Sequence, residues 1–355
     1  MRIEIYKQMA QQMTILRACF LLMILLLSTQ LCIAQDLIYS QFFNAPNYLN
    51  PALNGQFEGD LRMSAIYRSQ WTKVQGSLSN YSFAVDYQVP SFGGGFGLIM
   101  NKSSEGTAYI SKTNFAGVYS YSIEFNENTI SFGIQAGVTN RKIDYDKLVF
   151  PDQIDGGGII GGGATSASYP AFNNKYFFDA GAGLNFVTGN FMAGFSAQHL
   201  NKPDESFTGS ISKLPIRYGG HMSYMIKTRP FDHDDDSAFI PSVVIYNQAK
   251  INSFSAGVQY KNRNVNLGLW YRGDGKQQDA IVLSLIFDIF KHRDSNSRMR
   301  FGVSHDATTS RINYTNTGGT TEGAFVYEMD LPNRGNASGY NNRGSSYANK
   351  CYKFY

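Results

Sequence analysis

The chain contains 355 residues, of which 16% are charged and 14% are aromatic. Soluble proteins carry about 25% charged residues, and the mean hydropathy of -0.26 excludes a chain that is hydrophobic throughout. These values favour a membrane wall whose residues alternate between a lipid face and a polar interior.

Residues 1–34 are predicted to be a secretory signal peptide. Its apolar run at 18–27 follows three basic residues and is too short to cross a membrane as a helix. We expect cleavage after Ala34 rather than lipoprotein processing at Cys32, because no small residue directly precedes this cysteine. Cleavage removes three basic residues and one acidic residue, so the net charge falls from +4 to +2 and gives no basis for nucleic-acid binding. Only Cys351 remains, which excludes an intrachain disulfide.

The segment 35–60 precedes the first predicted strand and is too apolar to be a disordered tail. Its large apolar side chains are Phe42, Phe43, Tyr48 and Leu53. Proline fixes one backbone angle in Asn50-Pro51-Ala52, and asparagine can bond to neighbouring backbone groups, so this stretch predicts a defined bend. We expect the bend to pack against the inner wall of a barrel near Arg68 and Trp71, as a plug.

The stretch 114–138 carries the strongest strand signal in the chain. Apolar and polar residues alternate with period two on both sides of Asn126-Glu127-Asn128, which predicts a hairpin of about 12 residues to a side. Ordinary strands have about 5 to 6 residues, whereas tilted membrane-spanning strands need about 9 to 11. The hairpin therefore indicates a membrane wall.

The same alternation predicts about fourteen strands. Their approximate ranges are 61–70, 79–89, 95–103, 112–125, 129–141, 176–187, 190–198, 214–227, 239–248, 251–261, 264–273, 278–289, 298–305 and 322–331. In the eighth of these, Leu214, Tyr218 and Met222 are expected to face lipid. The ninth is the least regular, because Pro241 cannot donate to a strand ladder.

The fold class predicted from these strands is all-β. No run after the signal peptide reaches the roughly 18 apolar residues of a membrane helix, so the chain can cross a membrane only as a closed barrel. We predict a transmembrane antiparallel β-barrel of about 14 strands at 61–331, in the outer membrane, followed by a polar tail at 332–355 with an aromatic end.

Connection lengths favour periplasmic chain ends. Short turns at 90–94, 126–128, 188–189 and 262–264 alternate with longer connections at 71–78, 142–175, 199–213 and 306–321. Bacterial barrels place their short turns in the periplasm and their long loops outside. The connection at 228–238 and the turn near Lys250 are exceptions to this alternation.

Charged residues of both signs take the inward parity. They are Arg62, Arg68, Asp86, Glu124, Arg141, Asp179, Arg217, Arg272, Asp288, Arg300 and Glu328. Mixed charges can pair across the interior, which favours a filled barrel over a pore selective for one sign of ion. A barrel interior that is merely polar is the alternative.

Several blocks resemble the PorP/SprF family of type IX secretion membrane proteins. The N-terminal signature is Tyr39 to Ala52 followed by Ile66 to Trp71, and later blocks lie at Gly268 to Arg272, at Gly302 to Asp306, and at Glu322 with the final strand. A terminal Cys-x-x-Phe also fits, although Tyr352 stands where many relatives have proline. The candidate structural or partner-contact residues on these motifs are Asn44, Asn50, Pro51, Ala52, Arg68, Trp71, Arg272, Cys351 and Phe354.

The resemblance implies a non-enzymatic outer-membrane component of the type IX secretion and gliding system. Its expected role is that of a barrel partner for export or surface anchoring of a secreted protein. Expected partners are a cargo protein with a type IX export domain, other secretion or gliding components, and outer-membrane lipid. A transporter of hydrophobic or small solutes, of the fatty-acid-channel type, is the alternative.

The chain shows no arrangement typical of catalysis, cofactor binding or metal binding. Ser304-His305-Asp306 contains the residue types of a catalytic triad, but neighbours on a strand face opposite ways. Gly156 to Gly161 matches GxGxxG without a strand before it and a helix after it. The aspartates at 232–236 lack the glycine and distal glutamate of a calcium loop. We therefore expect no catalytic, cofactor or metal site.

Overall fold

The computed structural model describes most of the chain after the predicted signal peptide. The described residues are 36–57, 59–89, 93–106, 110–126, 128–156, 158–159, 165–168, 173–207, 210–228, 237–262, 264–289, 297–331 and 354. The predicted signal peptide at 1–34, the aspartates at 232–236 and Cys351 lie outside these residues. No helix among the described residues is long and apolar enough to cross a membrane.

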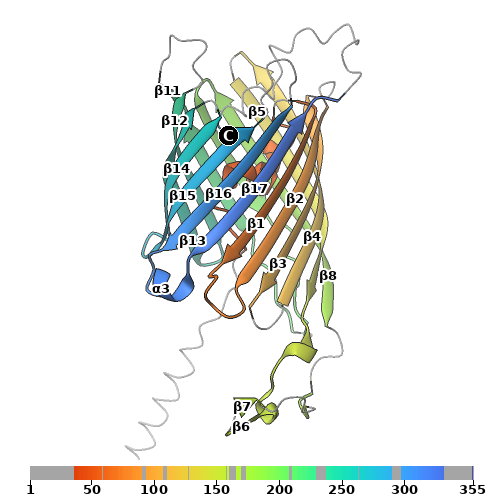
Figure 1. Ribbon diagram of the computed structural model, residues 1–355. Coiled ribbons are helices and arrows are strands. Elements are labelled where there is room, and N and C mark those ends of the chain that lie inside the picture. The colour runs from red at the N-terminus through yellow and green to blue at the C-terminus, as the bar shows by residue number, and fades with distance from the viewer. Residues whose placement is uncertain are drawn as a thin grey trace, which may run out of the picture. The chain divides into compact units, whose positions relative to one another are not determined.

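A single antiparallel sheet closes on itself to form a barrel (Figure 1). Its strands are β1 (Leu61–Gln70), β2 (Leu78–Val89), β3 (Gly94–Glu105), β4 (Ile110–Phe125), β5 (Asn128–Lys142), β8 (Asn174–Thr188), β9 (Phe191–Gln198), β10 (Arg217–Tyr224), β11 (Ile226–Lys227), β12 (Ala238–Gln248), β13 (Ile251–Asn262), β14 (Val265–Gly273), β15 (Gln278–Ile289), β16 (Arg298–Thr308) and β17 (Thr320–Met329). Of these 15 segments, β11 continues β10, so the wall has 14 strands. β1 pairs with β17, and β10 pairs with both β9 and β12. The predicted fold is confirmed.

The interruption between β10 and β11 has a local cause. The register pairs Ser223 with Ser242 and Ile226 with Phe239, which places Pro241 opposite Tyr224. Because proline has no N–H to donate, the ladder breaks there and resumes after Met225.

One boundary of the eighth predicted strand was wrong. This strand begins at Arg217 and not at 214. Leu214 was expected to face lipid, but it is 4% exposed, and its backbone N–H donates to the Pro203 carbonyl at 2.8 Å. The residue therefore belongs to the loop that precedes the strand.

The hairpin of β4 and β5 shows the predicted alternation over 16 and 15 residues. Phe115 and Ile134 are exposed on the outer face, whereas Ser120 and Ser131 are buried on the inner face. Period-two alternation thus separates a lipid face from a polar inner face along this hairpin.

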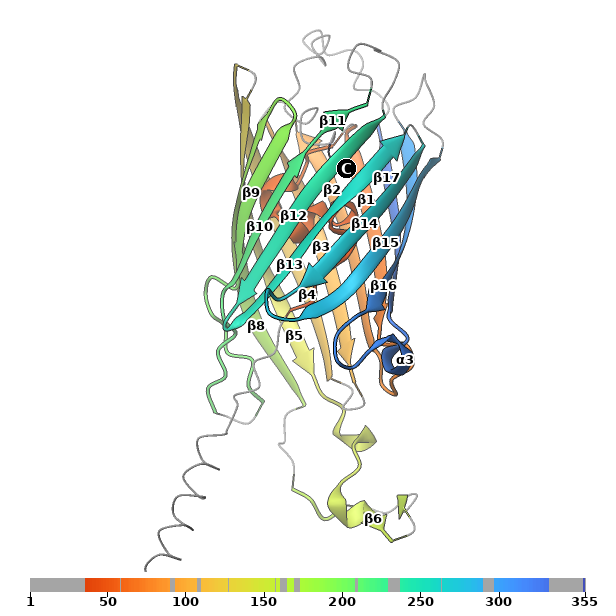
Figure 2. The same cartoon turned by 90° about the vertical axis from the view of Figure 1, so that its left-hand side faces the viewer.

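Among the described residues, three short helices of the N-terminal segment lie inside the barrel, as Figures 1 and 2 show. They are η1 (Phe42–Asn44), α2 (Pro46–Leu49) and η2 (Pro51–Leu53). Proline begins both α2 and η2, where its fixed φ suits a helix start and its missing N–H has no intrahelical partner to lose. The Asn50 side chain caps η2 by accepting a hydrogen bond from Ala52 N at 2.9 Å.

The two ends of the barrel differ. One end carries η4 (Tyr145–Lys147), η5 (Pro151–Gln153), the hairpin of β6 (Ile154–Asp155) and β7 (Gly158–Ile159), and α3 (Tyr314–Thr317), as both views show. We call this the long-loop end. The opposite end, called the short-turn end, carries the tight turns after β4 and β8.

Candidate functional site

The lumen and the segment 37–57 inside it form the candidate site. The charged residues predicted to face inward are buried, apart from Glu124, Arg141 and Asp179, which are half-buried. Those predicted orientations are confirmed. A buried charge without a partner would destabilise the folded protein, so each of these residues needs contacts inside the lumen. Those contacts show how the lumen is filled.

Two arginines and two carboxylates form a buried cluster, here called the arginine cluster. Arg68 Nη1 lies 3.2 Å from Asp306 Oδ2 and also pairs with Glu322. Arg272 Nη1 lies 2.9 Å from the same Asp306 oxygen, and its Nε lies 2.5 Å from Asp279 Oδ2. Two of the predicted site residues, Arg68 and Arg272, are thus brought together from opposite ends of the sequence.

The N-terminal segment binds directly to the arginine cluster. Ser40 N–H donates to one Glu322 carboxylate oxygen at 2.7 Å, and Gln41 N–H donates to the other at 2.9 Å. Ser40 Oγ donates to Asp306 Oδ2 at 2.7 Å and accepts from Arg272 Nη1 at 2.9 Å. Glu322 is therefore shared between an arginine of the wall and the backbone of the segment, which holds the segment in one position.

A second ionic anchor lies at Arg62 and Asp86. Their Nη2 and Oδ2 atoms are 2.6 Å apart. Arg62 Nη2 also donates to the Leu53 carbonyl at 3.3 Å, while Gly55 N–H donates to Asp86 Oδ2 at 2.9 Å. The Phe57 ring lies 4.7 Å from the guanidinium carbon of Arg62, so both partners of this pair hold the segment's end.

Asn44 contacts a third ionic group near the end of β15. Its Oδ1 accepts from Arg300 Nη1 at 3.4 Å, and its Nδ2 donates to Gln41 Oε1 at 3.0 Å. Asp288 in turn pairs with Arg300 at 3.0 Å and with Arg298 at 2.6 Å. Asn44 therefore links the segment to a carboxylate with two arginine partners.

The stretch Asn50-Pro51-Ala52 lies elsewhere in the lumen than predicted. Asn50 Nδ2 donates to the carbonyls of Leu184 and Phe195 at 2.9 and 3.3 Å, which belong to β8 and β9. The prediction that this bend packs near Arg68 and Trp71 was wrong.

Trp71 takes no part in these contacts. It follows β1 with a φ of 58°, and its backbone N–H donates to the Gly319 carbonyl at 2.9 Å. Its backbone therefore connects two loops at the long-loop end.

Glycines on the inner face of the wall leave room for the segment. A Cβ on Gly133 would lie 2.2 Å from the Pro51 carbonyl carbon, and one on Gly183 would lie 1.9 Å from Asn50 Oδ1. Further inward glycines with such close contacts are Gly95, Gly97, Gly194 and Gly302. Our sequence reasoning missed them, although glycines at inward positions of several strands are a readable sign of close approach.

An apolar cluster covers the other side of the lumen, and our sequence reasoning missed it as well. Phe42 packs edge-on against Trp270, with ring centroids 5.1 Å apart. Other lumen-facing members are Val187, Met192, Ile240, Val244, Val282 and Ile286, which pack with Phe43, Leu49 and Leu53 of the segment.

Phe354 also belongs to this apolar cluster and is 3% exposed. It is the one predicted site residue of the C-terminal motif that lies among the described residues. The chain's last aromatic stretch thus places a ring in the same apolar environment as Phe42 and Phe43.

The triad-like stretch does not converge on one site. Ser304 and Asp306 are buried in the lumen, whereas His305 bonds to Thr321 Oγ1 at 3.0 Å and Tyr314 Oη at 3.1 Å. Within the described ranges, no group of three or more His, Cys, Asp or Glu residues could hold a metal ion.

Comparison with known proteins identifies the family. Residues 31–327 match the family described as type IX secretion system membrane protein PorP/SprF. The chain belongs to the PorP/SprF family. It is an outer-membrane β-barrel of the type IX secretion system. Among curated proteins, none matches.

Several solved outer-membrane proteins are similar at low identity. The Pseudomonas putida toluene transporter TodX is 10% identical, with 79% of this chain and 92% of that chain covered and a TM-score of 0.46. A FadL homologue of Pseudomonas aeruginosa is 10% identical over 78% and 91% of the two chains, with a TM-score of 0.40. Omp33 of Acinetobacter baumannii is 7% identical over 78% and 100%, also with a TM-score of 0.40.

Proposed function

We propose that this PorP/SprF protein is a non-enzymatic barrel partner for export or surface anchoring of a secreted protein. Family membership supports a role in type IX secretion. The observation that carries the proposal is that the segment 37–57 is bonded to ionic groups on one side of the lumen and packed against apolar groups on the other. A barrel filled in this way suits a protein partner better than a solute channel.

The segment 35–60 acts, in this proposal, as a plug. Solutes crossing the lumen beside it would have to separate Ser40 and Gln41 from Glu322, or Leu53 from Arg62, and each separation leaves a buried polar group without its partner. Arg68, Arg272, Asn44 and Asn50 therefore have a positioning role for the plug and are not free to bind cargo.

The long-loop end is the proposed surface for the secreted partner. Its largest connection contains β6 and β7, and Asp152 organises part of it by accepting from Ser166 N at 2.6 Å and Thr165 Oγ1 at 2.9 Å. Loops carried by a rigid scaffold commonly hold binding residues. The tail at 332–355 is a second proposed contact surface through Tyr352 and Tyr355, because aromatic ends suit the apolar pockets of a partner. Phe354 is not offered to a partner in this proposal, since it is buried in the apolar cluster.

The role in secretion is tested by deleting the gene and restoring it on a plasmid. Surface display of one secreted protein with a type IX export domain should be lost while its synthesis continues, and the restored gene should recover display. Affinity capture of the tagged barrel should retain that cargo or another secretion or gliding component. Unchanged display of every type IX cargo, with no partner captured, would reject the proposal.

The plug is tested separately by removing residues 36–58 from the mature protein. Ion conductance in planar bilayers should rise, because the deletion removes the contacts that fill the lumen. Heat-modifiable migration on a gel checks that the shortened barrel still closes. A folded deletion variant that conducts no more than the full chain would show that the segment does not block the lumen.

Transport of a hydrophobic solute is the second candidate, and the apolar cluster around Trp270 is the observation that favours it. The cluster is covered by Phe42 and Phe43 in this structure, so a solute would have to displace the plug. Binding of a fluorescent fatty acid by the full chain, weakened by Trp270→Ala, would support transport over cargo handling.

A further inference from the structure

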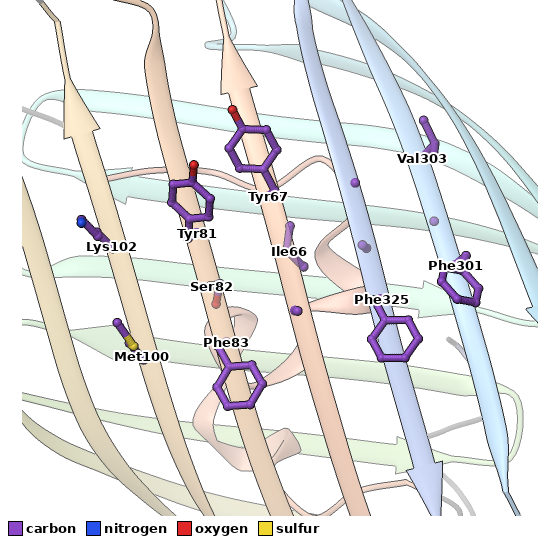
Figure 3. Close-up of a pocket in the computed structure, with 14 residues that line it drawn as sticks. Ile66, Tyr67, Tyr81, Ser82, Phe83, Met100, Lys102, Phe301, Val303 and Phe325 are labelled. Atoms are coloured by element: carbon purple, nitrogen blue, oxygen red, sulfur yellow. The ribbon is translucent and has the colours of Figure 1, made fainter.

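A second site lies on the outer wall, where the barrel faces lipid. A groove of about 550 Å³ crosses β16, β17, β1, β2 and β3. Figure 3 shows the side chains that line it. Volumes of this size are typical of sites for small molecules. The groove lies on the outer wall, apart from the lumen and from the loops proposed to bind a secreted partner.

The strand register explains why the wall is hollow here. Ala65 is paired with Phe325 on one side and Phe83 on the other, and Gly323 is paired with Tyr67 and Val303. Small residues on two adjacent strands thus form a floor between large side chains. Two rims border it: the paired rings of Tyr67 and Tyr81, 4.8 Å apart, and those of Phe301 and Phe325, 5.0 Å apart.

The groove is polar at one end and apolar at the other. The row nearer the long-loop end contains Tyr67, Tyr81 and Lys102, which are register neighbours across three strands. The next row toward the short-turn end contains Phe83 and Met100 with Ala65 and Phe325, and carries no charge. Figure 3 places the Lys102 amine and the two tyrosine hydroxyls toward the same side.

We propose that this groove binds one acyl chain of an anionic membrane lipid. The acyl chain of the lipid lies over Ala65 and Gly323 between the two aromatic rims. Lys102 holds the phosphate of the lipid headgroup. A lipid is the occupant because the groove opens on the outer face of a membrane barrel, among exposed residues such as Phe83 and Val303. Among the described residues that line the groove, Lys102 is the one cation, and it selects a negative headgroup in the leaflet at the long-loop end.

Gly323 provides a clean way to fill the groove. A Cβ at this position would meet nothing within 4 Å, and Gly323 is not among the glycines with positive φ, so a larger residue fits the backbone. Gly220 on β10 is a matched control, because its Cβ would also meet nothing within 4 Å and it lies outside the groove. Gly323→Leu should therefore close the site, while Gly220→Leu adds the same side chain elsewhere.

Native mass spectrometry of the full-length protein in detergent provides the test. Lipid A is the anionic probe, and phosphatidylethanolamine is the zwitterionic comparison. The unaltered barrel should retain one lipid A, Gly323→Leu should weaken that binding about tenfold, and Gly220→Leu should leave it unchanged. Lys102→Gln should weaken binding of lipid A roughly two- to fivefold without changing that of phosphatidylethanolamine. Heat-modifiable migration confirms that each variant is folded.

Three outcomes would overturn the inference. Equal retention of lipid A by Gly323→Leu and the unaltered protein would show that the groove holds no lipid. Equal loss in Gly220→Leu would show that the effect is not local. A dimer that Gly323→Leu converts to a monomer would assign this face to a second copy of the chain instead.

Discussion

The lumen holds one segment between two different walls. The ionic wall, formed by β1, β2, β16 and β17, presents Arg62, Arg68, Asp86, Asp306 and Glu322. The apolar wall presents residues of β8, β9, β12, β14 and β15, with Trp270 against Phe42. β14 and β15 also carry Arg272 and Asp288, which belong to the ionic groups. The segment therefore makes its hydrogen bonds to charged groups on the ionic wall. On the apolar wall it buries apolar area beside a few neutral hydrogen bonds, such as those of Asn50 to the carbonyls of Leu184 and Phe195.

The ionic wall sets the position of the segment, whereas the apolar wall mainly adds buried area. An ion pair or a backbone hydrogen bond depends on a particular partner at about 3 Å, and a buried charge left alone is strongly destabilising. Apolar contact is non-directional, and its contribution scales with the area removed from water. We therefore expect substitutions in the ionic wall to release the segment more readily than substitutions in the apolar wall.

The largest effect is expected for Glu322→Ala. This change leaves Arg68 with Asp306 as its remaining carboxylate partner in the arginine cluster. It also removes the acceptor for two backbone N–H groups, at Ser40 and Gln41. Breaking one side of a buried pair costs about 3 to 5 kcal/mol. Hydrogen exchange across 37–57, followed by mass spectrometry, should show release of the segment.

A double variant sharpens this prediction. Arg68→Met combined with Glu322→Leu removes the unpaired charge and leaves Asp306 with Arg272 and Ser40. It should retain more protection in 37–57 than Glu322→Ala alone. If both variants exchange at the rate of the unaltered protein, the ionic wall does not position the segment.

A smaller effect is expected for Gly133→Ala, on the side of the lumen away from the arginine cluster. The new Cβ would meet Pro51 and Ala52 backbone atoms at 2.2 to 2.4 Å, and backbone cannot rotate aside as a side chain can. Overpacking of this kind costs about 1 to 3 kcal/mol. Conductance steps should rise as the segment shifts, whereas Gly220→Ala, with open space around its Cβ, should behave as the unaltered barrel.

The apolar wall should respond less to a single change. Val282 is 2% exposed and belongs to the apolar cluster, so Val282→Ala removes two buried methyl groups, worth about 1.6 kcal/mol. Urea unfolding in lipid vesicles measures the loss. If Val282→Ala loosened 37–57 as much as Glu322→Ala does, the distinction between the two walls would fail.

Sequence reasoning predicted the wall but not the docking of the segment. Alternation is a local signal, since each residue's facing follows from its neighbours, and the inward positions of Arg62 and Asp288 were read from it correctly. Docking depends on residues far apart in the chain, such as Ser40 with Glu322. No local pattern states which wall a helix such as η2 will meet.

Asn50 shows which contacts can be predicted from the sequence and which cannot. Its side chain was correctly expected to bond to the nearby backbone, because that contact spans two residues, to Ala52. Its other bonds, to Leu184 and Phe195, require knowledge of how the barrel closes. The inward glycines at 133 and 183 were the available sequence signal, and they mark the side of the lumen that the bend contacts.

The smallest effect is expected outside the lumen, at Asp204 in the loop before β10. Its carboxylate accepts hydrogen bonds from Ser212 N at 2.8 Å and Ser206 N at 3.3 Å. These two backbone hydrogen bonds lower the pKa of Asp204, and the bond from Ser212 has the larger effect. A lowered pKa means that the loop is stabilised above the ordinary carboxyl pKa of about 3.9, and that this stabilisation is lost as pH falls through the lowered value. Protection of the Ser206 and Ser212 amides should therefore be constant from about pH 5 to 8 and fall below about pH 4.

Asp204→Ala should remove the same protection at neutral pH while leaving exchange in 37–57 unchanged. The reason is that the Asp204 side chain is 40% exposed, and among the described residues its carboxylate bonds to Ser206 and Ser212 of the same loop and to Lys175, at 3.7 Å. Its loss therefore leaves no buried charge behind. Exchange rates divided by the intrinsic rates at each pH separate this effect from the pH dependence of exchange itself. Should Asp204→Ala also expose 37–57, the loop would be coupled to the plug, and the two lumen walls would not account for its position by themselves.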